Sequence, residues 1–347
     1  MVINSTKLFL SKNSLYHNVD YLKETKKKKL LPVVKANGYG HGMEEIVGAL
    51  YFHGQKEYAV ARYVEAERIR KMGLKDIRIL VFESIGDYSL IENKEDIDIS
   101  ANNINELKSA LKYGIPSTRI QIKIDFGFGR NGIYPSEITE LKKIIDKTEG
   151  KFRGLYSHLF AVNYEDGLLY IKQFNEIVDI LGKDKFEMIH LQNSAATLTY
   201  DCKIVTHIRA GMLIYGLQDD GFYERNLKQI FSLESEISSI RNLENSKYIA
   251  YNLKKSDCNA KHIAKIKLGY ADGFLKSNEG SFCLIGNREY KILQVTMDNT
   301  FLEVDESIRE VDSVLLYHNV SLAALHNKMT IYELLTILSP RIPRVFR

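Results

Sequence analysis

Short apolar runs alternate with helix-patterned stretches along the first two-thirds of the 347-residue chain. The runs that we expect to form strands cover residues 31–34, 57–61, 77–82, 97–100, 120–124, 152–157, 188–191 and 206–209. Apolar residues recur at helical spacing in residues 12–23, 44–52, 64–72, 104–113, 136–147 and 166–181. Several of these stretches are followed by a glycine, which favours a helix end: Gly54, Gly73, Gly114 and Gly182.

This alternation predicts an α/β protein built on a closed (β/α)8 barrel of the TIM type. Eight strands that alternate with helices fit into about two hundred residues, and the active site of such a barrel lies at the carboxyl ends of its strands. An open doubly wound sheet is the alternative. The glycine-rich phosphate motif that such a sheet carries after its first strand is absent from the sequence.

The alternation stops near Asn226, and the rest of the chain has a different pattern. Short β-like runs follow at residues 232–240, 262–268, 282–285, 292–296 and 313–317, with turn residues between them. A last helix is expected at residues 330–338, before Pro340. We therefore expect two domains, a barrel in residues 1–228 and a smaller, mainly β C-terminal domain in residues 229–347.

Composition and charge exclude several classes of function. A chain of this length with 45% apolar residues can bury a large core. Its net charge of +4 is small, and no basic face with interleaved aromatic residues indicates a nucleic-acid partner. Without a signal-like start or a membrane-length apolar run, we expect a cytoplasmic protein that has no membrane partner. Cys202, Cys258 and Cys283 lack metal-site spacing, so we expect incidental thiols and no metal.

A lysine stands where the first barrel strand is expected to end. Residues 30–34 form the apolar run, and Lys35 is followed by Gly38, Gly40 and Gly42. Because these glycines do not prolong a strand, the chain must turn directly after the lysine. A desolvated amine has a lowered pKa and is the nucleophile that condenses with carbonyl cofactors. Lys35 is therefore the first candidate for a catalytic residue.

Other charged and polar residues stand at the ends of later barrel strands. These residues are Lys123 and Arg130 after the fifth strand, His158 after the sixth, Asn193 and Ser194 after the seventh, and Arg209, Gly211 and Met212 at the eighth. Since parallel strands of a barrel end at one rim, we expect these side chains to surround one cavity. Its lysines, arginines and histidine suit an anionic cofactor, and backbone amides after the last strands bind phosphate groups.

The string V-V-K-A-N-G-Y-G-H-G around Lys35 resembles the pyridoxal-phosphate lysine motif of alanine racemases, and the resemblance extends from Leu8 almost to Arg347. It implies that pyridoxal 5'-phosphate is the cofactor and that Lys35 holds it as a Schiff base. Positions that match further cofactor contacts of the family are Tyr39, Arg130, His158, Asn193, Ser194, Arg209, Gly211, Met212 and Tyr332.

The resemblance gives some of these residues individual roles. Arg130 matches an arginine that contacts the phenolic oxygen of the cofactor and the substrate, and Lys123 matches a lysine that is often carbamylated. Arg209 matches the arginine at the pyridine nitrogen, and His158 matches a histidine that supports this arginine. Ser194 and the amides of the residues after Arg209 match the phosphate site.

The resemblance also implies functional residues in the β domain. Tyr270, in the string G-Y-A-D-G, matches a second catalytic base that reaches into the active site of the partner subunit. Met297 and Asp298 match residues that line this shared site, with Met297 as a substrate contact. The resemblance therefore implies a homodimer with shared active sites.

The implied reaction is the racemisation of an amino acid, L- and D-alanine being the expected pair, which supplies D-alanine for cell-wall synthesis. Lys35 and Tyr270 would lie on opposite faces of the substrate Cα, so that one base removes a proton and the other replaces it. Arg209 would leave the pyridine nitrogen unprotonated, because a guanidinium does not give up its proton. This arrangement favours quick reprotonation over transamination.

Some positions depart from the family pattern and leave the substrate open. Phe126 and Phe128 replace a threonine and a methionine close to the cofactor, Asn163 replaces an entrance aspartate, and Gln294 replaces an entrance arginine. A racemase for another amino acid is therefore one alternative. A non-catalytic protein that binds pyridoxal phosphate is another, although such proteins lack the β domain. A fold-related decarboxylase would need an acidic residue where this chain has Arg209.

Overall fold

The computed structural model describes residues 5–94, 96–161, 163–218, 224–251, 253–257 and 260–347. The chain divides into two compact units. One unit contains Ser14–Gly38 and Ile46–Lys228, and the other contains Met1–Asn13, Tyr39–Glu45 and Gln229–Arg347. We refer to them as the barrel unit and the β unit.

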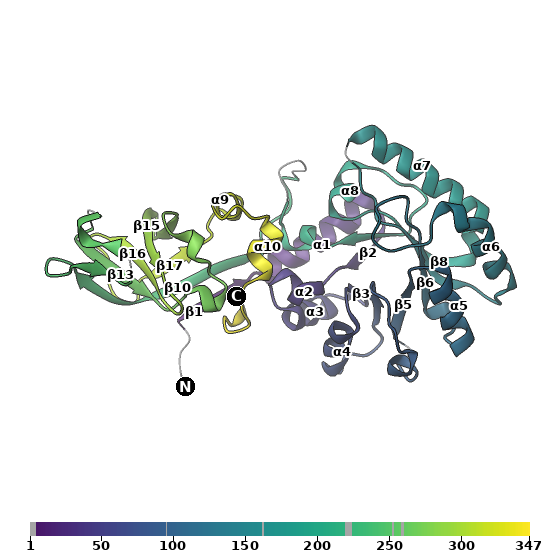
Figure 1. Ribbon diagram of the computed structural model, residues 1–347, viewed down its shortest axis with the longest axis horizontal. Helices are drawn as coiled ribbons and strands as arrows, with labels where there is room; N and C mark the ends of the chain where they lie inside the picture. Colours follow the sequence, from purple (N-terminus) through teal and green to yellow (C-terminus); the bar gives the residue numbers. More distant parts are fainter. Residues whose placement is uncertain (1–4, 95, 162, 219–223, 252, 258–259) are drawn as a thin grey trace. The chain divides into compact units, whose positions relative to one another are not determined.

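The barrel unit is built on parallel strands (Figure 1). Over the described residues its sheet has eight strands in the order β2-β9-β8-β7-β6-β5-β4-β3. The strands are β2 (Lys29–Pro32), β3 (Glu57–Val60), β4 (Arg78–Val81), β5 (Ile97–Ala101), β6 (Ile120–Lys123), β7 (Phe152–Tyr156), β8 (Phe186–His190) and β9 (His207–Ala210). The ring closes between β2 and β3, where Val33 forms a parallel bridge with Ala59. The predicted (β/α)8 barrel is confirmed.

Helices connect these strands and lie outside the barrel. They are α1 (Lys12–Lys26), α3 (Met43–Phe52), α4 (Tyr63–Lys71), α5 (Ile104–Tyr113), α6 (Ile138–Lys147), α7 (Tyr164–Leu181) and α8 (Ser194–Thr199). Helix α5 shows how the sequence sets their bounds. The Asn103 side chain accepts a hydrogen bond from the Glu106 N–H at 2.8 Å and caps the first turn. Gly114 ends the helix with φ 99°, a conformation that glycine adopts without a steric penalty.

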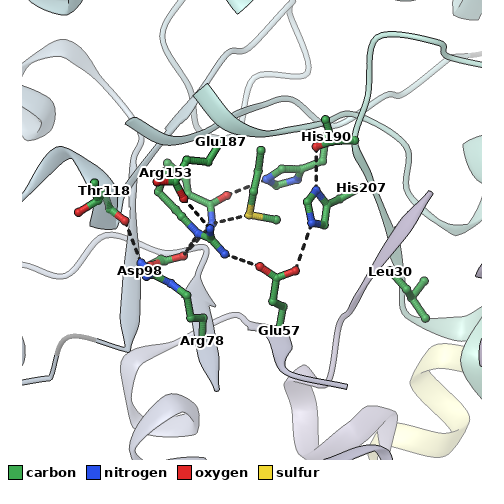
Figure 2. Close-up of polar contacts among 12 residues, drawn as sticks. Leu30, Glu57, Arg78, Asp98, Thr118, Arg153, Glu187, His190 and His207 are labelled. Carbon is green, nitrogen blue, oxygen red and sulfur yellow. Dashed lines mark hydrogen bonds and ion pairs between the residues drawn. The ribbon is translucent and has the colours of Figure 1, made fainter. Parts of the chain in front are cut away.

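Charged side chains fill part of the barrel interior (Figure 2). Asp98 of β5 is paired with Arg78 of β4 and with Arg153 of β7, whose Nε lies 3.0 Å from the carboxylate. Arg153 also pairs with Glu57 of β3, which lies 3.1 Å from His207 Nε2 of β9. Although burial acts to raise it, the contacts with His207 and Arg153 lower the pKa of Glu57 to about 2. The buried charges therefore compensate one another and connect strands around the ring.

The β unit is a mainly antiparallel sheet that curls into a ring. Its strands are β1 (Thr6–Leu10), β10 (Phe231–Asn242), β13 (His262–Ile266), β14 (Phe282–Ile285), β15 (Arg288–Val295), β16 (Thr300–Val304), β17 (Ser313–Leu316) and β18 (Arg344–Phe346). The order is β13-β16-β15-β14-β17-β10-β1-β18, and an additional β10–β13 pairing closes the ring. A short hairpin, β11 (Tyr248–Ile249) with β12 (Leu253–Lys254), and helices α9 (Val320–His326) and α10 (Ile331–Thr336) complete the unit. The predicted mainly β character is confirmed.

The N-terminal strand corrects part of the predicted barrel range 1–228. Strand β1 pairs antiparallel with β10 and parallel with β18, so it belongs to the β unit. Its alternating burial, with Leu8 and Leu10 inside, suits a strand that has one face against the core of that sheet. We predicted no strand for residues 6–10, because a short alternating run next to a helix pattern does not reveal a partner more than two hundred residues away.

Further observations concern thiols, metals and membranes. Cys202 and Cys283 are buried free thiols, as predicted, and Cys258 lies outside the described residues. Within the described part of the chain, histidine, cysteine and acidic side chains form no group that could hold a metal ion. Among the same residues, no helix has the length and apolar character needed to cross a membrane.

Candidate active site

Lys35 follows the end of β2 and begins a left-handed turn. Strand β2 ends at Pro32, before the predicted end at Val34, yet the Val34 N–H still donates to the Ala59 carbonyl at 2.9 Å. The turn, labelled α2 (Lys35–Tyr39), has positive φ at Ala36 (52°), Asn37 (55°), Gly38 (62°) and Tyr39 (53°). Left-handed backbone costs about 1–2 kcal/mol for each residue that carries a Cβ. Such strain is typical of functional sites.

An acidic side chain from the next βα unit holds this turn. Glu65 Oε1 accepts a hydrogen bond from the Ala36 N–H at 2.6 Å, and Oε2 accepts one from the Ala61 N–H at 2.9 Å. The Gly38 N–H donates to the Val34 carbonyl at 3.0 Å. These contacts offset the backbone strain and fix the direction in which the Lys35 side chain leaves the strand.

The Lys35 amine is a weakened base. Burial, followed by the positive charge of Arg130, lowers the pKa of Lys35 from its usual value. Glu65 and Glu83 oppose this shift, and Arg209 adds to it. A lysine whose pKa is lowered holds more of its amine in the neutral, nucleophilic form near neutral pH. This property is the one that the sequence analysis expected of Lys35.

A single carboxylate organises the loop that follows β6. The buried Asp125 accepts hydrogen bonds from the N–H groups of Gly127 and Phe128 at 2.9 and 2.7 Å, and from those of Gly129 and Arg130 at 3.0 and 3.2 Å. The loop therefore wraps around one side chain, and the wrapping sets the position of the Arg130 backbone. The sequence analysis gave Asp125 no role, although it lies between the site candidates Lys123 and Arg130.

His158 marks the place where the charges of the rim converge. Burial and the charges of Arg209, Arg130, Lys123 and Lys35, in that order, lower the pKa of His158 to about 3. His158 is therefore a neutral imidazole at physiological pH. Its Nε2 lies 3.4 Å from Asn193 Nδ2. The charges of the predicted lysines and arginines of the barrel therefore all act on one histidine, and this positive environment suits an anion.

Arg209 is buried in the barrel and is held by strands β7 and β8. Its Nη1 lies 2.8 Å from His190 Nδ1, and its Nη2 donates to the carbonyls of Ser157 and Leu191 at 2.8 and 3.1 Å. We did not predict the contact with His190. The available signal was a histidine in the otherwise apolar strand M-I-H-L, one strand away from Arg209 in the barrel. The supporting role given to His158 stays a prediction.

The residues expected to bind the phosphate follow the ends of β8 and β9. Asn193 caps α8 by accepting a hydrogen bond from the Ala196 N–H at 2.9 Å. The Gly211 N–H points to Ser194 Oγ at a distance of 3.2 Å, so the hydroxyl and this amide lie side by side. Met212 is buried and begins a 3-10 turn that runs to Tyr215. A hydroxyl and backbone amides that lie so close form a donor set that suits a phosphate group.

The remaining predicted site residues belong to the β unit. The Tyr270 N–H donates to the Thr296 carbonyl and the Ala271 N–H donates to the Met297 carbonyl, both at 3.0 Å, so the segments of Tyr270 and Met297 are neighbours. Tyr270 is 45% exposed and Met297 is 53% exposed. Asp298 pairs with Arg341 at 2.9 Å. These residues form a second cluster, on a different unit from Lys35.

Tyr39 and Tyr332 form a further pair in the β unit. Their ring centroids lie 5.8 Å apart, with planes inclined at 48°. Tyr332 belongs to α10, whose first turn is capped by Thr330 and Glu333. Gly40 follows Tyr39 and packs against this helix, because a Cβ there would lie 2.0 Å from the Leu335 carbonyl oxygen. The glycine-rich turn after Lys35 is therefore needed for close packing as well as for turning.

The positions that depart from the family pattern have different surroundings. Phe128 lies beside His158, with ring centroids 5.4 Å apart, and the Arg130 guanidinium lies 4.7 Å from its ring. Phe126 packs instead against Tyr170 of α7, at 4.7 Å.

The two positions expected at the entrance have structural partners. The Asn163 side chain caps α7 by accepting from the Asp166 N–H at 2.9 Å. Gln294 is buried in β15 and accepts from the Tyr251 N–H at 3.1 Å. Of these four positions, Phe128 is therefore the one whose side chain contacts Arg130 and His158.

The burial of Lys123 in its charged form lowers the stability of the folded chain. Burial and the charges of Arg130 and Arg209 lower the pKa of Lys123 to about 8, from the ordinary 10.5. Between about pH 8 and pH 10.5 the unfolded chain binds more protons than the folded chain, so stability rises with pH there. We expect Lys123→Met to unfold at a higher urea concentration than the parent at about pH 7, and this gain to shrink above about pH 8.

The control for this prediction is Lys172→Met, at an exposed position of α7. Lys172→Met should change the urea midpoint of unfolding only slightly, and by the same amount at about pH 7 and at about pH 10. A Lys123→Met variant whose midpoint differs from that of the parent by the same amount at about pH 7 and at about pH 10 would show that Lys123 is not destabilised by charge in the folded chain.

Comparisons with known proteins agree with these observations. The family model "Alanine racemase, N-terminal domain" matches residues 10–219, and "Alanine racemase, C-terminal domain" matches residues 230–346. The alanine racemase of Staphylococcus saprophyticus is 30% identical over 341 residues, covering 92% of this chain and 88% of that protein.

Solved structures show the same likeness. The crystal structure of alanine racemase from E. faecalis has a TM-score of 0.87 at 25% identity and covers 99% of this chain and 98% of that one. That of alanine racemase from Bartonella henselae with covalently bound pyridoxal phosphate has a TM-score of 0.84 at 19% identity and covers 99% of each chain. The chain belongs to the alanine racemase family.

Proposed function

We propose that this chain interconverts L- and D-alanine with pyridoxal 5'-phosphate as its cofactor. The observation that carries the proposal is the convergence of Lys35, Lys123, Arg130 and Arg209 on His158 in a chain of this family. A group of lysines and arginines that includes a weakened lysine base suits a phosphorylated aldehyde. By the same resemblance, the product serves cell-wall synthesis.

The residues of the barrel unit fit this cofactor. Ser194 Oγ and the amides of Gly211 and Met212 would hold the phosphate, and Arg130 would contact the phenolic oxygen. Arg209, which is fixed by His190 and two backbone carbonyls, would donate to the pyridine nitrogen. Lys35 would form the covalent bond to the cofactor. Tyr39 and Tyr332 of the β unit would contribute to the phosphate site.

The chemistry divides between the cofactor and the chain. When bound, pyridoxal phosphate withdraws electrons from the amino acid and so acidifies its Cα–H. Lys35, whose pKa is lowered, takes this proton from one face of the Cα and returns it there in the reverse direction. When Lys35 removes a proton, Tyr270 donates one to the other face, and in the reverse direction Tyr270 removes the proton and Lys35 donates, so each reaction inverts the Cα. Arg209 keeps its proton throughout, because a guanidinium does not ionise in proteins.

We propose that Tyr270 acts in the site of a partner subunit, in a homodimer whose barrel and β domains are those predicted as residues 1–228 and 229–347, apart from residues 1–13 and 39–45, which belong to the β unit. The exposure of Tyr270 and Met297, which lie next to each other, supports a partner surface that covers them. Met297 and Asp298 would line this shared site. The cytoplasmic location of the protein stays a prediction.

A racemisation assay over a panel of L-amino acids tests the function. Purified protein loaded with pyridoxal phosphate should convert L-alanine to its D-form faster than the other amino acids of the panel. Faster conversion of a different amino acid would keep the reaction and change the substrate. It would also direct attention to Phe128, which lies beside His158. Protein that binds the cofactor and racemises nothing would be a non-catalytic carrier, and the proposal would be wrong.

A further inference from the structure

A row of hydrogen-bonded side chains runs through the barrel interior from Arg209 to Asp98. Arg209 Nη1 lies 2.8 Å from His190 Nδ1, and His190 Nε2 lies 2.7 Å from Gln121 Oε1. Gln121 Nε2 lies 3.1 Å from Asp98 Oδ2. The four residues come from strands β9, β8, β6 and β5, and each is at most 4% exposed. These buried polar groups therefore form hydrogen bonds with one another and are shielded from bulk water.

The two ends of the row fix the direction of every hydrogen bond in it. A guanidinium only donates and an ionised carboxylate only accepts. Asp98 is paired with Arg78 and Arg153, as Figure 2 shows, so its carboxylate oxygens act as acceptors. The Gln121 amide must therefore turn its NH2 group toward Asp98 and its oxygen toward His190. His190 in turn must carry its proton on Nε2 and present a bare Nδ1 to Arg209.

The His190 ring is also held in place by its other neighbours. It stacks on Tyr156, with ring centroids 4.7 Å apart and planes inclined at only 5°. The Tyr156 hydroxyl lies 2.6 Å from Ser100 Oγ. Burial and the charges of Arg209, His207 and Arg153 lower the pKa of His190 well below its usual value, so the ring stays neutral. A neutral ring has one bare nitrogen, and the row decides which one it is.

We propose that Gln121, oriented by Asp98, is a positioning residue that keeps His190 in the tautomer with its proton on Nε2, and that it thereby fixes Arg209. The tautomer of His190 is set by side chains of the barrel unit alone and does not depend on the cofactor. The consequence for catalysis rests on the proposed function, in which Arg209 donates to the pyridine nitrogen. Gln121 stands two residues before Lys123 in β6, and its side chain lies between those of Asp98 and His190.

Replacement of the Gln121 amide should allow His190 to adopt the other tautomer. In Gln121→Met, which keeps most of the side-chain volume, the buried Nε2–H of His190 loses its acceptor. An unpaired buried donor is unfavourable, so the tautomer with the proton on Nδ1 becomes competitive. That tautomer does not accept from Arg209, and the guanidinium then loses the contact that orients Nη1.

Nitrogen NMR of the full-length, cofactor-loaded chain with 15N-labelled histidine rings measures the tautomer. The signals of His190 are the pair that is missing from the spectrum of His190→Asn. We expect a protonated Nε2 and a bare Nδ1 in the parent, and shifts of both nitrogens toward a tautomer mixture in Gln121→Met. A parent ring protonated on Nδ1, or a Gln121→Met spectrum identical to that of the parent, would overturn the proposal.

Asp98→Asn is a second variant that tests the far end of the row. Its amide can donate as well as accept, so Gln121 is no longer forced into one orientation, and His190 should again show both tautomers. If Gln121→Met does not fold, this variant and the parent spectrum still decide the question. A single Nε2–H tautomer in folded Asp98→Asn would mean that Asp98 does not orient Gln121.

Activity supplies a separate measurement with a matched control. Gln121→Met should lower kcat for racemisation by about ten-fold, the size of effect typical when an outer hydrogen-bond partner is lost. Gln55→Met removes a buried glutamine of the same unit that donates to the carbonyls of Leu30 and Glu57, and it should leave kcat unchanged. Equal losses in both variants would make Gln121 merely structural. A parent protein without racemase activity would refute the proposed function. The tautomer of His190 is measured by NMR and does not depend on that activity.

Discussion

Lys35→Ala should abolish racemisation, with a loss of at least about 10³-fold, because the change removes both the group that bonds to the cofactor and one of the two proton-transfer groups. Each of these functions requires an amine at the end of β2, where burial and Arg130 lower the pKa of Lys35. The protein should still fold, since the alanine leaves the contacts of Glu65 with the following turn intact. The measurements are the initial rate with L-alanine and the visible absorption of bound cofactor after gel filtration.

The control for Lys35→Ala is Lys108→Ala, at an exposed position of α5 where the lysine pairs with Glu140. This variant should retain parental activity and cofactor absorption. A small primary amine added to Lys35→Ala should restore part of the rate, since the missing group is then supplied from solution. Cofactor that stays covalently attached to Lys35→Ala would assign the bond to another lysine and contradict the proposed role.

The barrel and the positions at its rim were predictable because they depend on local patterns. Strand ends follow from short apolar runs, and a parallel barrel brings all those ends to one rim. Lys35, Lys123, Arg130 and Arg209 could therefore be assigned to one place without knowledge of any contact between them. The charges of all four residues act on His158, which agrees with this expectation, and their functional roles stay predictions.

The parts that were not predictable depend on partners far apart in the chain. Arg153 and Glu57 are separated by 96 residues, and no pattern in either strand indicates the other. His190 was hidden for the same reason, since a histidine in an apolar strand does not reveal whether it faces the barrel interior or what it contacts there. The left-handed backbone at Ala36 and Asn37 was also hidden, because neither residue type requires it.

Strain and charge in the barrel unit occur where the proposed function needs them. A left-handed turn follows Lys35, and lysines and arginines crowd the same rim. Both features cost stability, and both are offset by contacts beneath the rim, such as those of Glu65 with the turn and of Asp125 with the loop before Arg130. A site that binds an anion is expected to regain this cost when the anion is present.

Mixing two inactive variants should restore activity if each site combines Lys35 of one subunit with Tyr270 of its partner. Lys35→Ala and Tyr270→Phe are each expected to be inactive, because each lacks one of the two bases. After random exchange about half of the dimers are mixed, and each mixed dimer holds one intact site and one doubly defective site. About a quarter of all sites should then be active, and the rate should approach about a quarter of the parental rate.

The structure motivates this experiment and supplies its control. Tyr270 and Met297 lie next to each other and are 45% and 53% exposed, although Lys35 belongs to the other unit of the chain. An isologous twofold contact would complete two such sites at once. The control mixture combines Lys35→Ala with the double variant Lys35→Ala/Tyr270→Phe, in which no site can be intact. Differently tagged subunits that co-purify demonstrate exchange, and exchange without recovery would mean that both bases of a site come from one chain.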